Sequence, residues 1–158
     1  DTQQFYHSLM HGPEPEKQHY PSLSKQCAGI KSILESIDSE RSACCIVART
    51  NNEIKAIAEA LSSYRIPVHL LEGRTADAAK NAVNLATMHR VKGLEFDYVI
   101  LASVNKGMVP LDFVLGKAGD QVTRRQKENE ERALVYVSMT RARKKAFILS
   151  YGQKSDWF

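Results

Sequence analysis

Apolar residues in the first part of the chain follow two spacings, one typical of helices and one of buried strands. Over residues 24–37 they recur mostly every three or four positions, which predicts a helix with one apolar side. Residues 43–48 form a continuous apolar run, which predicts a strand buried on both faces, as in a parallel sheet. A second amphipathic helix is predicted to reach about Ser63, with Asn51 or Asn52 as its N-cap.

The rest of the chain continues this alternation of strands and helices. Further strands are predicted at 66–71, 83–88, 98–104 and 146–151, and further helices at 75–81 and 125–141. Glycine and proline predict an irregular segment or linker at 1–21 and a long loop at 105–123. The pattern therefore predicts one α/β domain over 22–158, with a parallel sheet flanked by helices.

Composition narrows the class of protein. The 158 residues suit one domain, and the 43% apolar fraction suffices for a core. No apolar run approaches the roughly 18 residues that indicate a membrane span. Three cysteines predict no disulfide framework, and no metal-ligand spacing occurs. We expect a cytoplasmic protein without a membrane or metal site of its own. The chain does not begin with Met, which normal processing can explain, but we expect a fragment of a longer protein because the function inferred below needs parts that this sequence lacks.

The net charge of +4 is unevenly distributed. Segment 123–145 carries eight basic residues and three acidic ones, so the remainder of the chain is slightly acidic. Such a segment suits a polyanion, either nucleotide phosphate or nucleic acid. A solvated helix face is the alternative, and charge alone favours it.

Segment 86–97 combines a strand, a polar loop and the start of another strand. Gly93 permits a tight turn, and Glu95 can accept a hydrogen bond from a sugar hydroxyl. The candidate phosphate donors are Thr87, His89, Arg90 and Lys92. An ordinary strand–turn–strand with a solvated loop remains the alternative, and physical chemistry alone favours it.

Two further segments carry candidate phosphate ligands. The packed face of the helix within 131–143 is expected to aim Arg141 outward, and the planar fork of arginine suits a phosphoryl group. For the following cations, Arg143 to Lys145, we favour complementing the negative C-terminal end of the helix. Residues 49–52 lie at a strand end and a helix start, where phosphate binding and a simple N-cap are equally plausible.

Together these segments resemble the UvrD/Rep-like superfamily-one helicases. Residues 87–96 are similar to the fifth motif of that family, and residues 130–142 to the sixth. Residues 48–51 and 105–110 resemble two further segments of the family. The resemblance covers roughly 43–158, with the segments in the family's order.

The resemblance implies a RecA-like (P-loop NTPase-like) domain, two of which clamp ATP and magnesium in such helicases. Arg141 would be the arginine finger on the γ-phosphate, stabilising charge that develops in the transition state. By position, the nucleotide contacts would be Gly93, Glu95 and, loosely, Lys92, and the nucleic-acid contacts Thr87, His89, Arg49 and Thr50. Glu95 would contact the ribose.

The chain also departs from the family pattern. It has no G-x-x-x-x-G-K-[ST] loop (Walker A), no recognisable Asp-Glu pair for magnesium, no evident Asn-Tyr-Arg fourth motif and no large inserted subdomain. We therefore expect ATP and Mg²⁺ to be held mainly by an N-terminal RecA-like domain that this sequence does not contain. The expected partners are that domain and single-stranded or duplex DNA, and the chain alone is expected to be inactive.

Two other functions remain open at this stage. The chain could be a nucleic-acid-binding or partner-binding module derived from the helicase fold, including one that acts on RNA polymerase. A small-molecule α/β enzyme is a more distant alternative, because no nucleophile–base pair is apparent.

Overall fold

The central feature of the molecule is a parallel β-sheet. The computed structural model describes residues 14–72 and 79–158. Within them, the strands are β1 (Glu16–Tyr20), β2 (Cys44–Ala48), β3 (Val68–Leu70), β4 (Val83–Thr87), β5 (Phe96–Leu101) and β6 (Ala142–Tyr151). They form a six-stranded sheet in the order β1-β6-β5-β2-β4-β3, and every neighbouring pair is parallel. The predicted α/β class is confirmed.

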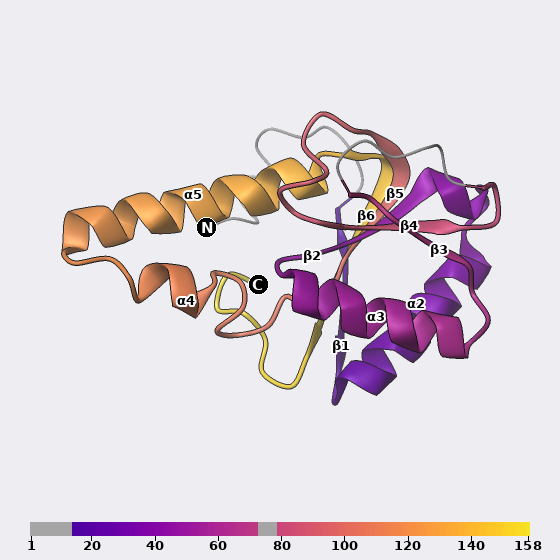
Figure 1. Cartoon of the computed structure of the whole chain (residues 1–158), viewed down its shortest axis with the longest axis horizontal. Coiled ribbons are helices and arrows are strands. Elements are labelled where there is room, and N and C mark those ends of the chain that lie inside the picture. Colours follow the sequence, from indigo (N-terminus) through magenta and orange to yellow (C-terminus); the bar gives the residue numbers. More distant parts are fainter. Residues whose placement is uncertain (1–13, 73–78) are drawn as a thin grey trace.

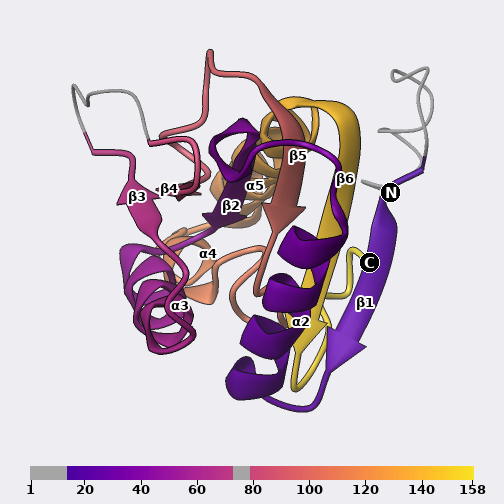
Figure 2. The same ribbon diagram turned by 90° about the vertical axis from the view of Figure 1, so that its right-hand side faces the viewer.

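Helices cover both faces of this sheet. They are α2 (Leu23–Ser36), α3 (Asn51–Ser63), α4 (Asp112–Leu115) and α5 (Gln121–Met139), with a short 3-10 helix at Arg41–Ala43. Figure 2 shows α2 and α3 in front of the sheet and α5 behind it. The sheet is therefore the middle layer of three, as the predicted alternation of strands and helices requires.

Strand β2 shows how the sequence builds two cores. Its alternate side chains point to opposite faces. Cys44, Ile46 and Ala48 join the core beneath α2 and α3. Cys45 and Val47 join the core beneath α5. All five residues of the strand are buried, which confirms the predicted two-sided burial, and burial raises the pKa of the Cys44 thiol to about 12.

Side-chain caps fix where the longer helices begin. Ser22 caps α2 by accepting from the Lys25 amide, and Asp120 caps α5 by accepting from the Thr123 amide. Thr50 caps α3 by accepting from the Glu53 amide. The predicted cap at Asn51 or Asn52 is therefore wrong by one or two positions: Thr50 keeps extended backbone angles, whereas both asparagines already lie in the helix.

Three predicted segments differ from the structure or lie partly outside the described residues. Residues 16–20 are strand β1 at the sheet edge and not part of an irregular segment, because the neighbouring prolines flank the strand without interrupting it. The predicted loop at 105–123 contains α4 and the first turn of α5. Most of the predicted helix at 75–81 lies outside the described residues, and Lys80 and Asn81 form a turn.

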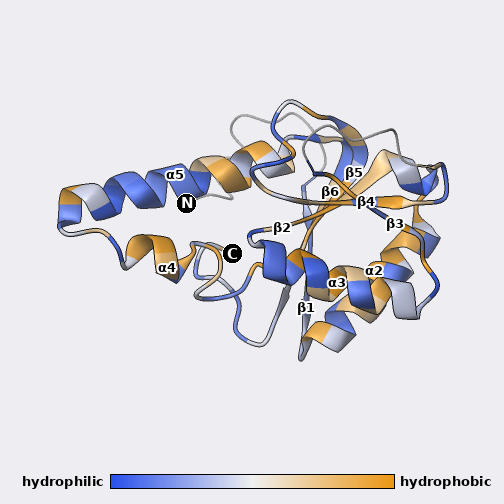
Figure 3. Ribbon diagram, in the orientation of Figure 1, coloured by the Kyte–Doolittle hydropathy of each residue, from blue (hydrophilic) through white to orange (hydrophobic). Residues whose placement is uncertain are grey.

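Helix α5 extends well beyond the sheet (Figure 1). Its end near the sheet is apolar and its far half is hydrophilic (Figure 3). Val135 and Met139 are buried against the sheet. In the far half, exposed ion pairs join Arg124 to Glu128 and Lys127 to Glu130. For these cations the structure supports the solvated-face interpretation.

Candidate functional site

The predicted site residues divide between the two edges of the sheet. Arg49 directly follows β2, and His89 is two residues beyond the end of β4, so both lie at the carboxyl edge. Glu95 precedes β5 and Arg141 precedes β6, so both lie at the opposite, amino edge. Residues 88–95 run from one edge to the other, and they link the two groups.

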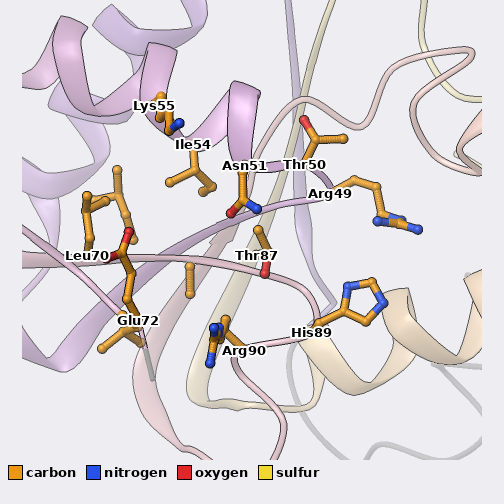
Figure 4. Close-up of a pocket in the computed structure, with 13 residues that line it drawn as sticks. Arg49, Thr50, Asn51, Ile54, Lys55, Leu70, Glu72, Thr87, His89 and Arg90 are labelled. Carbon is orange, nitrogen blue, oxygen red and sulfur yellow. The ribbon is translucent and has the colours of Figure 1, made fainter. Parts of the chain in front are cut away.

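At the carboxyl edge a cleft of about 870 Å³ opens between the start of α3 and the ends of β3 and β4. Figure 4 shows Arg49 and His89 on the side of the cleft next to α5, with Thr87 and Asn51 near its centre. The predicted Thr50 also lines it. The structure thus brings together the four residues that the resemblance assigned to nucleic acid.

Further polar residues of this cleft were missed or not assigned by sequence reasoning. Asn51 and Lys55 come from the first turns of α3, and Arg90 from the loop after β4 (Figure 4). A helix N-terminus with adjacent cations is suited to a phosphate. Lys55 lies four residues after Asn51, one helical turn further along α3, so this spacing in the sequence could have indicated that the two residues share a face. Glu72, across the cleft, is its acidic member.

Arg49 was expected to contact nucleic acid, but its side chain is largely buried and paired with a carboxylate. Its Nε and Nη2 each donate to a carboxylate oxygen of Glu131 on α5, both at 2.9 Å. The side chains are 11% and 4% exposed, so the pair is nearly buried. Bidentate arginine–carboxylate pairs are strong and directional. The guanidinium therefore joins the cleft to α5.

His89 lies beside this ion pair. Partial burial, followed by the positive charge of Arg49, lowers the pKa of its imidazole, while Glu131 acts in the opposite direction. The neutral ring is therefore favoured near neutral pH. A neutral imidazole can both donate and accept a hydrogen bond.

At the amino edge, Arg141 folds back against the end of α5. Its Nε donates to the Val137 carbonyl at 3.2 Å, and longer bonds of 3.4 Å reach Leu94 O and Thr140 Oγ1. The expectation that the helix would aim this side chain outward is therefore wrong for this conformation. The two Nη contacts are long, so the end of the guanidinium is held only weakly.

The cations after Arg141 also differ from expectation. They were expected to complement the C-terminal end of the helix, but they belong to β6 and pair with carboxylates. Arg143 contacts Asp97 at 3.1 Å and Glu95 at 3.5 Å. Lys144 contacts Asp38 and Asp97, and Lys145 contacts Glu16. Arg141 is the residue that satisfies a helix-end carbonyl.

Gly93, Glu95 and Lys92 lie in the linking loop. Gly93 has a φ of +83°, which confirms the predicted tight turn, because side chains are strained in that region. Glu95 is 65% exposed and adjacent to Arg141, since the Phe96 amide donates to the Arg141 carbonyl. Lys92 is exposed and lines a groove along α5 with Met88, Val114 and Leu134. Glu95 does not line this groove, whereas Arg49 and His89 line both it and the cleft.

A buried polar network between α2 and the residues after β5 was not predicted. Gln26 of α2 donates to Ser103 Oγ at 3.0 Å and accepts from the Ser103 amide at 2.8 Å. Ser103 has a φ of +59°, so this pair holds a left-handed residue after β5. Nearby, Tyr151 donates to Glu53 at 2.6 Å. The one signal in the sequence was Gln26, a polar residue within the apolar side of its helix.

This architecture defines an α/β domain of the RecA-like class. A solved C-terminal domain of a possible DNA helicase from Lactobacillus plantarum matches 98% of this chain and 86% of its own, at a TM-score of 0.67 and 19% identity. An arterivirus helicase solved with DNA matches 95% of this chain and 30% of its own, at a TM-score of 0.53 and 7% identity. At these identities the likenesses show the fold alone.

The chain belongs to the family of UvrD-like helicase C-terminal domains. The model of that family matches residues 72–154, just over half of the chain. Among its relatives, a probable DNA helicase II homolog of Mycoplasma pneumoniae is 28% identical over 123 residues, which are 77% of this chain and 16% of that protein. DNA helicase II of Escherichia coli is 38% identical over 78 residues, 49% of this chain and 10% of that protein.

The chain thus spans about a sixth of these relatives or less. The family match includes His89, Glu95 and Arg141, and Arg49 lies before it. Among the residues that the structure describes, no helix is both long enough and apolar enough to cross a membrane.

Proposed function

We propose that the chain is the C-terminal motor domain of a cytoplasmic, ATP-dependent DNA helicase. It completes an ATP site whose phosphate-binding half belongs to an N-terminal RecA-like domain, and it contacts single-stranded DNA. The observation that carries this proposal is the arrangement of the site. The cationic cleft lies at one edge of the sheet, Arg141 and Glu95 lie at the opposite edge, and residues 88–95 join the two edges.

The amino edge supplies one half of a nucleotide site. Glu95 and Arg141 are brought together because β5 and β6 are parallel neighbours whose first residues pair. An exposed carboxylate can accept hydrogen bonds from ribose hydroxyls. Arg141 would turn from its long Nη contacts toward a γ-phosphate held by the other domain, where its charge stabilises the transition state.

When bound, ATP would supply the transferred phosphoryl group, and Mg²⁺ would neutralise part of the negative charge of its phosphates. This chain lacks a phosphate-cradling loop, so its residues fit the role of completing the site and not of holding the cofactor alone. Gly93 shapes the turn that precedes Glu95. Lys92 lines the groove along α5, and its assignment to the nucleotide rests on its position in the motif alone.

The carboxyl edge suits a nucleic-acid strand. Lys55 and Arg90 provide charge for the phosphates, and Thr50 and Asn51 mark the start of α3, whose amides favour anions. Thr87 and His89 add polar contacts at the beginning of the linking loop. A strand bound here would contact the same loop that ends at Glu95, which gives DNA binding a direct path to the nucleotide.

The first test is the activity of the chain by itself. Purified protein should hydrolyse ATP no faster than buffer, with or without oligonucleotide, because the phosphate-binding half of the site is absent. It should nevertheless bind single-stranded DNA in a salt-dependent manner. Release of inorganic phosphate and fluorescence anisotropy measure the two properties.

The outcomes separate the proposal from its alternatives. Robust hydrolysis by pure protein would contradict the half-site, and absence of DNA binding at low salt would contradict the cleft. A nucleic-acid-binding or RNA-polymerase-binding module predicts the same result for the isolated chain. It differs in predicting that Arg141 is dispensable for ATP turnover in the longer protein.

A further inference from the structure

Arg49 and Glu131 form a bidentate ion pair between two nearly buried side chains. Both bonds measure 2.9 Å, and the side chains are 11% and 4% exposed. The other ion pairs of the described residues each include a side chain at least 35% exposed. A carboxylate is buried to this extent only when it is paired.

Glu131 also connects more than two elements. Its Oε1 accepts from the Leu111 amide at 3.0 Å, in the segment that precedes α4. Arg49 belongs to the turn between β2 and α3, and that turn lines the cleft. One carboxylate therefore joins the cleft, the segment before α4, and α5.

Helix α5 leads from this contact to Arg141. Glu131 lies in its second half, about 12 Å of helix from the last residue, Met139. Met139 is fully buried, so this end of the helix is in direct contact with the core beneath it. A displacement of Glu131 along or around the helix axis would therefore move the backbone that carries Arg141.

We propose that Glu131 is a positioning residue that couples the cleft to Arg141, with Arg49 serving as its anchor and not as a phosphate contact. The inference rests on the proposed nucleic-acid function of the cleft and assigns the cleft residues different tasks. Lys55 and Arg90 contact the nucleic acid. Arg49 and Glu131 transmit the effect of nucleic-acid binding along α5 to Arg141.

The first experiment counts phosphate contacts from the salt dependence of binding. The affinity of the chain for fluorescein-labelled oligo(dT) is measured by anisotropy over a range of salt concentrations. Each phosphate contact to a single strand contributes about 0.7 to the slope of log affinity against log salt. The slope is negative, and Arg90→Ala should therefore reduce its magnitude by about 0.7.

The informative variant removes both charges of the pair. Arg49→Met with Glu131→Gln keeps the net charge and avoids leaving a buried charge alone. Its slope should equal that of the unaltered chain, provided circular dichroism shows the same fold. A slope reduced in magnitude as much as in Arg90→Ala would make Arg49 a phosphate contact and overturn the inference.

Single substitutions of glutamate give the matched comparison. Glu131→Gln should increase the magnitude of the slope by up to about 0.7. The reason is that Arg49 loses its carboxylate partner and becomes available to a phosphate. Glu128→Gln, on the far half of the same helix, should leave the slope unchanged. An equal increase in magnitude in both variants would mean that general charge, and not the pair, controls binding.

The second experiment observes Arg141 directly. In ¹⁵N-labelled chain, saturation with oligo(dT) should shift the Nε–H signal of Arg141, although this residue is at the edge opposite the cleft. The double variant should bind oligo(dT) without that shift, whereas Glu128→Gln should retain it. A shift of the same size in the double variant, or no shift in the unaltered chain, would overturn the coupling.

Failure of this inference is distinct from failure of the proposed function. If the unaltered chain does not bind oligo(dT), the cleft is not a nucleic-acid site and both fall. If it binds and the slopes or shifts contradict the pair's role, only the positioning role of Glu131 falls.

Discussion

His89 is the residue of the cleft whose charge can change near neutral pH. Partial burial and the neighbouring Arg49 lower the pKa of its imidazole below the ordinary value of 6.5. A bound phosphate acts in the opposite direction, because an anion favours the protonated ring. Binding of a nucleic acid in this cleft should therefore take up protons.

The prediction is that DNA affinity increases as the pH falls. The increase begins above the lowered pKa of the free protein, where binding must add the proton, and it levels off once the free ring is itself protonated. Anisotropy titrations with oligo(dT) between pH 8 and pH 5 measure it. His89→Asn should flatten this dependence.

His19→Asn provides the control for this titration. His19 lies on β1 and contacts Ser150, away from the cleft. The variant should keep the pH dependence of the unaltered chain. A His89→Asn profile indistinguishable from that of His19→Asn would place the titrating group elsewhere.

At the scale of elements, the contact between β1 and α2 was the least expected. Gly29 lies within α2, and a Cβ at this position would approach the ring of Tyr20 on β1. Elsewhere in a helix, replacing glycine by alanine stabilises by about 1 kcal/mol. At Gly29 the close tyrosine ring should make the same replacement destabilising.

We therefore predict that Gly29→Ala lowers the free energy of unfolding, measured by urea denaturation. Ser32→Ala, on the exposed side of the same helix, should be neutral or slightly stabilising. Combining Gly29→Ala with Tyr20→Ala should remove the clash, so that the added methyl group no longer destabilises. A stabilising Gly29→Ala in the otherwise unaltered chain would show that β1 does not pack against α2 as described.

The sequence predicted the central elements of the fold because their patterns are local. The fully apolar run of β2 and the spacing in α2 and α3 depend only on which face is buried. Strand β1 escaped prediction because an edge strand is half exposed and lacks an apolar run. The short α4 was hidden within a segment that glycine and proline marked as a loop.

Partners of the site residues were less predictable than the elements. Arg49 and Glu131 are far apart in sequence, and nothing in either segment indicates their pairing. Arg141 contacts the helix-end carbonyl that the cations after it were expected to complement, and those cations pair with carboxylates instead. The reason is that the helix ends two residues earlier than predicted and β6 begins at Ala142. The placement of Thr87 and His89 in one cleft was predictable from the carboxyl ends of parallel strands.

At the scale of the whole molecule, the proposed site is divided between the two edges of the sheet. The cleft proposed to bind a nucleic-acid strand lies at one edge of the sheet. Glu95 and Arg141 lie at the other edge, and the sequence contains no phosphate-binding loop to accompany them. We propose that this family member acts together with a second motor domain. Its chemistry would then arise only when a second domain closes on the amino edge.

The most direct test of this account is turnover by Arg141→Ala in a helicase chain that contains both motor domains. DNA-stimulated ATP hydrolysis should fall by about 10³- to 10⁵-fold, while ATP binding remains within a few-fold of the unaltered protein. Arg124→Ala, an exposed arginine on the far half of α5, should hydrolyse ATP normally. Unchanged turnover in Arg141→Ala would contradict the claim that this domain completes the ATP site.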